Sequence, residues 1–126
     1  MATVTTKLTI SSSDLTSQSL SLNLNKSISA TSTTGLARKA ITSTAKGTAS
    51  GQVTIHTAAD FTAPAYVYIK NTDSTNYITL LNDDAEDWGR LSPGEWAFFP
   101  VAPSVGFEAT ANTADVIVDI AIFTAS

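Results

Sequence analysis

Cysteine is absent from the 126-residue chain, and charged residues make up only 14% of it. The lack of cysteine excludes disulfides, thiol catalysis and thiolate metal ligands. Histidine occurs once, at His56, so a metal-binding histidine pair is also excluded. A hydrolytic triad would need His56 beside a nucleophile and an acid, and its surrounding sequence offers neither. We therefore expect His56 to have a structural or surface role, and we expect no enzymatic activity and no cofactor.

Long apolar runs are also missing. No run approaches the roughly 18 residues that a membrane-spanning helix needs. The first ten residues lack the apolar stretch of a signal peptide. We therefore expect no membrane partner.

Serine and threonine take the place of the missing charges, with 22 of them in the first 50 residues. Threonine is β-branched, and short polar side chains fit well on the surface of a pleated sheet. Uncharged hydroxyl surfaces also suit contact with a neighbouring protein, because burying an unpaired charge is costly. Both interpretations, ordinary sheet surface and assembly surface, remain open at this point.

Charge is distributed unevenly along the chain. Residues 1–50 carry a formal charge of +4, whereas residues 51–126 carry −8. The acidic bulk disfavours nucleic acid as a partner. Attraction between N-terminal and C-terminal parts, within or between subunits, fits the pattern better. We expect residues 1–50 to form a strand or arm region and residues 51–126 a β-sandwich body, within one domain overall.

Hydrophobic alternation predicts strands in the C-terminal half. Val116, Val118, Ile120 and Ile122 alternate with more polar residues, and we expect them to be buried on one face. Val105 and Phe107 are expected to lie opposite them, so that residues 105–123 form a hairpin.

Residues 65–70 and 77–81 predict a second hairpin, joined by a run of turn-forming residues. In the first of these strands, Tyr66 and Tyr68 share one face and Val67 and Ile69 the other. Residues 92–95, Ser-Pro-Gly-Glu, have the pattern of a type II turn that leads into a strand at 96–99. Pro100 and Pro103 are expected to end that strand.

The N-terminal half gives weaker signals. Residues 19–24 alternate cleanly, residues 4–10 suggest an opening strand, and Val53 and Ile55 mark another. Residues 36–41 are compatible with a loop, a strand or one helical turn. Seven or eight short strands separated by turns predict an all-β fold, a β-sandwich or jelly roll with an extended Ser/Thr-rich N-terminal region.

Two groups of residues are candidates for chemistry. The first group is acidic and consists of Asp83, Asp84, Glu86 and Asp87. It is compatible with a solvated turn, a cation site or a pair of catalytic carboxylates. The spacing of these residues does not match an EF-hand loop. We expect the exposed turn, without a bound metal. The second group is aromatic, and it forms either a sugar-stacking platform or part of the core or an interface. Its members are Tyr66, Tyr68, Tyr77, Trp88 and Trp96.

Four segments together resemble a known family. They are AYVYIKNTD at 65–73, LSPGEWAFFP at 91–100, SVGFEA at 104–109 and the apolar strand at 116–123. Their order and character are similar to those of small β-sandwich structural proteins in the virions of tailed bacteriophages. The resemblance covers about residues 52–126, whereas the first half matches only in its alternating, Ser/Thr-rich style.

The resemblance implies a virion part, most simply a capsid decoration or cement protein that stabilises the head. It leaves open a tail, neck, baseplate or fibre component, and a carbohydrate- or receptor-binding module. It also implies location in the virion, a homo-oligomer such as a trimer, and a major capsid protein or tail or neck proteins as partners. The charge pattern and the alternation suggest the contact residues Leu20, Leu22, Leu24, Arg38 and Lys39.

Overall fold

The computed structural model describes residues 2–15, 17, 19–43 and 52–125, and these residues form an all-β fold, as predicted. The described part contains ten strands. They are β1 (Ala2–Ser12), β2 (Leu20–Thr33), β3 (Ala37–Ile41), β4 (Val53–His56), β5 (Ala65–Asn71), β6 (Ile78–Asn82), β7 (Asp87–Leu91), β8 (Trp96–Val101), β9 (Phe107–Ala111) and β10 (Val116–Ala125).

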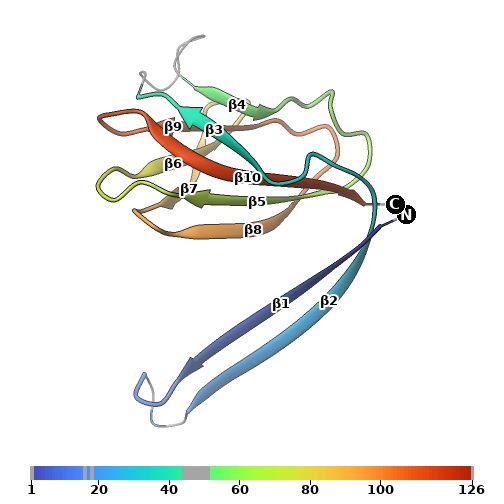
Figure 1. Ribbon diagram of the computed structural model, residues 1–126, viewed down its shortest axis with the longest axis vertical. Coiled ribbons are helices and arrows are strands. Elements are labelled where there is room, and N and C mark those ends of the chain that lie inside the picture. The colour runs from blue at the N-terminus through green and yellow to red at the C-terminus, as the bar shows by residue number, and fades with distance from the viewer. Residues whose placement is uncertain (1, 16, 18, 44–51, 126) are drawn as a thin grey trace.

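The strands form two antiparallel sheets that stack as a β-sandwich (Figure 1). The larger one, here the main sheet, has the order β1-β2-β10-β5-β8, and β3 also pairs with β10. The smaller one, here the small sheet, has the order β4-β9-β6-β7. Strand β10 therefore holds the main sheet together, because it pairs with β2, β3 and β5.

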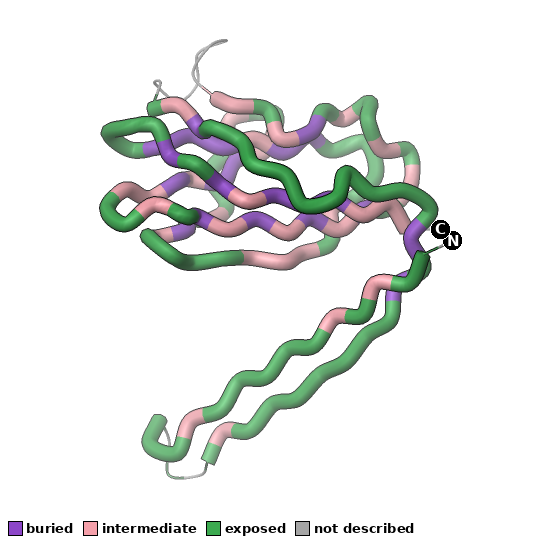
Figure 2. Tube along the Cα trace, in the orientation of Figure 1, coloured by how far each residue is buried: buried purple, intermediate pink, exposed green. Residues whose placement is uncertain are grey.

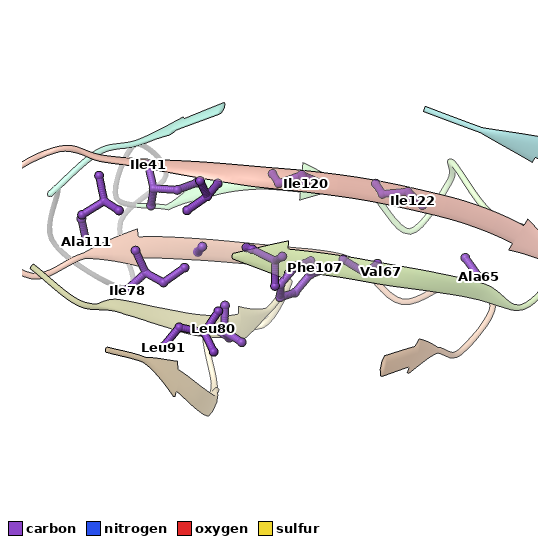
Figure 3. Packing of buried hydrophobic residues seen from close by; sticks show 14 residues of the cluster. Ile41, Ala65, Val67, Ile78, Leu80, Leu91, Phe107, Ala111, Ile120 and Ile122 are labelled. Atoms are coloured by element: carbon purple, nitrogen blue, oxygen red, sulfur yellow. The ribbon is translucent and has the colours of Figure 1, made fainter. Parts of the chain in front are cut away.

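The core lies between the inner faces of the two sheets (Figure 3). The four predicted residues of β10 are all buried, which confirms the alternation. Strand β5 alternates as predicted, with Val67 and Ile69 fully buried and the two tyrosines turned to the other face. Phe107 is buried as expected, but Val105 is 39% exposed, so its predicted place in the core is wrong.

Both predicted hairpins are wrong in the same way. Strands β5 and β6 lie in different sheets, and so do β9 and β10. The turn-forming residues between them are present as predicted, but each turn carries the chain from one layer of the sandwich to the other. A turn sequence specifies a reversal of direction, and it does not specify which sheet the next strand joins.

The predicted type II turn is confirmed, because Gly94 has a φ of +78° and the Glu95 N–H donates to the carbonyl of Ser92 at 3.0 Å. Pro100 does not end its strand, since β8 continues to Val101. Strand β8 is an edge strand, where a residue without an N–H is tolerated. The ambiguous segment 36–41 forms a strand, β3, and this strand belongs to the sandwich body.

A buried asparagine ties two of these connections together. The Asn71 side chain is fully buried, and its amide donates to the carbonyls of Asn76 at 2.8 Å and Leu91 at 3.1 Å. Its Oδ1 accepts the N–H of Asp73 at 2.9 Å. One side chain therefore links the turn after β5 to the end of β7.

The turn after Asn71 predicts acid sensitivity. Backbone N–H groups of Asn76 and Thr75 donate to the Asp73 carboxylate at 2.6 and 2.7 Å, and these bonds lower the pKa of Asp73. A lowered native pKa means that the carboxylate stabilises the fold above its unfolded pKa of about 4, and that this stabilisation is lost as the pH falls through the native value. The melting temperature should therefore fall less in Asp73→Asn than in the wild-type chain when the pH is lowered from neutral to about 2. An equal fall in melting temperature for the variant and the wild-type chain would contradict the stabilising role of the Asp73 carboxylate.

Candidate functional site

The described residues between 2 and 33 form a long two-stranded hairpin that projects away from the sandwich, and we call this hairpin the arm (Figure 2). Strands β1 and β2 pair over their lengths, with Leu8 opposite Leu24 and Ile10 opposite Leu22. The arm joins the body through β10, to which β2 pairs only at its end, between Ala30 and Thr33. The arm is therefore attached at one end and exposed along most of its length.

The arm has two chemically different faces. Because successive residues of a strand point to opposite faces, the paired positions separate its side chains cleanly. One face, the apolar face, carries Val4, Leu8, Ile10, Leu20, Leu22, Leu24 and Ile28, interrupted by Thr6, Ser12 and Lys26. The opposite face carries hydroxyl and amide residues almost throughout. Ile28 at the base is buried, whereas Leu24 is 55% exposed and Ile10 is 44% exposed.

A second uncovered surface lies on the outside of the main sheet. Half of the ten aromatic residues of the chain point to this side, and we call this surface the aromatic face. Tyr66 and Phe98 stack there, with ring centroids 5.7 Å apart, and Trp96 is 57% exposed. The five residues of the aromatic face are Tyr66, Tyr68, Trp96, Phe98 and Phe123.

The arm and the aromatic face enclose a groove. Its volume is about 590 Å³, and its walls are formed by residues 6–8 and 24–26 of the arm and by Trp96, Phe98 and Pro100 of β8. At the arm's side of this groove, Lys26 Nζ contacts the Tyr66 hydroxyl at 3.3 Å and lies 5.8 Å from the ring centroid. The groove therefore has apolar residues on both walls.

The predicted contact residues fall into two groups. Leu20, Leu22 and Leu24 lie together on the apolar face of the arm. Arg38 and Lys39 lie instead on β3 in the body, and Arg38 forms an ion pair with Asp119 at 3.2 Å. The structure thus brings the three leucines together and places the two basic residues on another element.

The acidic residues Asp83, Asp84 and Glu86 lie in the exposed connection between β6 and β7, and Asp87 is the exposed first residue of β7. Asn82 organises this connection, because its Oδ1 accepts the N–H groups of Asp84 and Glu86, and its amide donates to the Glu86 carboxylate at 3.1 Å. Among the described residues no group of three or more metal-ligating side chains converges here or elsewhere. The connection is an exposed turn, and its lack of a bound metal stays a prediction.

Trp88 lines a different groove, of about 410 Å³, between the small sheet and strand β8 of the main sheet. The indole is 49% exposed, and it packs edge-on against Phe99 at 4.8 Å. Most other lining residues are apolar, and the amide of the lining residue Asn82 is already engaged by the acidic turn. Tyr77 is half-buried beneath the Arg90 guanidinium, 3.6 Å from the ring centroid.

His56 lies in the sandwich, 4% exposed, with its ring 5.0 Å from that of Phe61. Its Nδ1 lies 3.3 Å from the carbonyl of Thr57, whereas Nε2 has no hydrogen-bond partner. The side chain is packed among the aromatic rings of Phe61 and Phe107.

Sequence reasoning found the aromatic face only in part. It grouped Tyr66, Tyr68 and Trp96 with Tyr77 and Trp88, which lie elsewhere, and it missed Phe98 and Phe123. Strands β5 and β8 are apolar on both faces, with Tyr66 and Tyr68 alternating with Val67 and Ile69. A strand that is apolar on both faces is usually covered on both sides. In a two-layer sandwich, only one side of the main sheet is covered by the small sheet.

Among the described residues, no helix is long and apolar enough to cross a membrane. Comparison of the chain with protein-family models, with curated proteins and with solved structures gives no match.

Proposed function

We propose that this chain is a structural subunit of a tailed-phage virion, and specifically a capsid decoration or cement protein that stabilises the head through protein–protein contacts. The observation that carries the proposal is the projecting arm with its uncovered apolar face. The family resemblance of residues 52–126 supports the assignment to a virion. The partners are other copies of the chain, as a homotrimer, and the major capsid protein.

The physical argument concerns the stability of the arm. A two-stranded hairpin alone in water is marginally stable at best, because it buries little apolar surface. Beyond the base of the arm, four apolar side chains are between 38% and 55% exposed. They are Leu8, Ile10, Leu22 and Leu24. Contiguous exposed apolar surface of this kind marks a site of interaction with another protein. The arm therefore has the properties of a segment that is completed by a partner.

A tail, neck, baseplate or fibre component is the alternative within the virion, and copy number separates it from a decoration protein. A head carries decoration proteins in hundreds of copies, whereas tail parts are present in small numbers set by their symmetry. The same arm would serve either assembly.

A carbohydrate- or receptor-binding module is the second candidate function. The half-exposed Trp88 beside the acidic turn supports it, because sugars stack on exposed aromatic rings. It ranks second because the amide of Asn82 is already bound within the turn. Binding to a glycan array that disappears in Trp88→Ala would favour this function over the first.

The proposed function predicts the contents of the particle. Virions purified from the host that makes this chain should contain hundreds of copies of it, measured by quantitative mass spectrometry. Leu22→Ser/Leu24→Ser should reduce incorporation at least tenfold, because the apolar face is lost. Leu36→Ser is the matched control, since Leu36 is 73% exposed and lies outside the arm. Particles without the chain would refute the proposal, and only a few copies per particle would indicate a tail component.

A further inference from the structure

We propose that the groove between the arm and the aromatic face receives the arm of another copy of this chain. Each copy gives its arm to one neighbour and accepts an arm from a neighbour, so that the copies close into a ring. The inference rests on the proposed assembly role, but it names the receiving surface and concerns only contacts between copies.

Both sides of the proposed contact are present and uncovered in a single chain. Leu8 and Leu24 form the arm's wall of the groove, and they are 41% and 55% exposed. Trp96, 57% exposed, stands on the opposite wall. The arm leaves the body at an angle (Figure 1), and its outer residues Ile10 and Leu22 are not among those that line the groove. The arm therefore leaves much of its own apolar face, and of its own aromatic face, open.

The two surfaces match each other in form. Both are faces of antiparallel β-ribbons, and such faces pack at about 10 Å with interdigitating side chains. The arm supplies aliphatic side chains, whereas β5 and β8 supply aromatic rings. Each chain carries one surface of each kind. A second copy therefore provides the complementary surface in the required one-to-one ratio.

Area favours a closed ring over a single contact. The eleven residues of β1 make a ribbon about 36 Å long and about 10 Å wide, so that one arm on one receiving face buries roughly 700 Å² in total. Stable specific contacts bury about 1,200 Å² or more. In a ring each chain makes this contact twice, once with its arm and once with its aromatic face, which raises the surface buried on each chain from roughly 350 to roughly 700 Å². A stable contact of about 1,200 Å² corresponds to roughly 600 Å² on each partner.

Charge favours the arm as the point of contact between copies. The body, residues 34–126 with β3 included, carries −5, so two bodies repel each other when they approach directly. The arm carries only Lys7, Lys26 and Asp14, a formal charge of +1. Contact of an arm with a body is therefore electrostatically attractive, whereas contact between two bodies is not.

The mass of the purified full-length chain in solution tests whether copies associate. Sedimentation equilibrium should give two or three times 13.2 kDa. Leu22→Ser/Leu24→Ser and Trp96→Ser should each weaken association at least tenfold, and Leu36→Ser should not. Circular dichroism of each variant checks that the sandwich remains folded. A wild-type chain of 13.2 kDa at all concentrations would overturn the inference.

Disulfide trapping tests which surfaces meet, because the chain has no cysteine of its own. Leu24→Cys in one preparation and Trp96→Cys in another, mixed and mildly oxidised, should give mainly the mixed disulfide. Replacing Leu24→Cys by Leu36→Cys provides the control, and its yield should be at least tenfold lower. Equal yields would overturn the inference. A monomeric chain that is nevertheless incorporated into virions would overturn it too, and would leave the proposed virion role standing without its homotrimer.

Discussion

Phe107→Ala should lower the free energy of unfolding by about 3–5 kcal/mol, among the largest effects of any single substitution in this chain. Phe107 is 2% exposed and lies between the two sheets. Its ring meets Phe99 edge-on at 5.4 Å and Trp88 at 5.6 Å. Its removal deletes a buried ring and leaves a cavity between the two sheets, which cannot easily move together to fill it.

Urea unfolding followed by tryptophan fluorescence measures this effect, with Phe98→Ala as the matched control. Phe98 is also an aromatic residue of the sandwich, but it lies on the aromatic face and is only partly buried. We expect a clearly smaller loss for the control. Equal losses for the two variants would show that the core is not organised around Phe107.

Asn71→Ala should cost about 3 kcal/mol or more, although the substitution removes only a few atoms. The carbonyls of Asn76 and Leu91 lose their donor, and the N–H of Asp73 loses its acceptor. A buried polar group left without a partner costs about 1–3 kcal/mol. The effect therefore comes from the groups that remain, and apolar replacements of similar size, such as Asn71→Leu, should be no better tolerated.

The melting temperature should fall by about 10 °C in Asn71→Ala, given about 3 kcal/mol and a domain of this size. Asn112→Ala is the control, because Asn112 is exposed in the turn between β9 and β10. Exposed substitutions usually change stability by less than about 0.5 kcal/mol. If both variants melt together, the connection through Asn71 is not a main support of the fold.

The sequence allowed the strands to be predicted better than their partners. In β10 and β5, side chains alternate between a buried and an open face, and a period of two is visible without any knowledge of the fold. The sheet that each strand joins depends on contacts across the sandwich. A turn such as that at 71–76 has the same composition whether it joins neighbours in one sheet or crosses between layers. Both hairpin predictions therefore failed in the choice of sheet.

The site was predicted in part for a similar reason. Alternation at Leu20, Leu22 and Leu24 shows which side of β2 is apolar, and the structure places all three on one face of the arm. Alternation cannot show whether the rest of the chain covers that side. Pro100 shows the same limitation, because its effect on β8 depends on whether β8 is an edge strand or a central one.

The position of β10 determines the order in which the chain can fold. The arm needs only contacts between nearby residues, and a hairpin of this kind forms within microseconds. The main sheet needs residues 116–125 to pair with β2, β3 and β5, and the paired residues are up to 95 positions apart, at Ala125 and Ala30. Such non-local pairing is slow. During synthesis the arm therefore emerges from the ribosome before the body, and the sandwich closes only after β10 has been made, so the apolar face is exposed to chaperones throughout translation of the body.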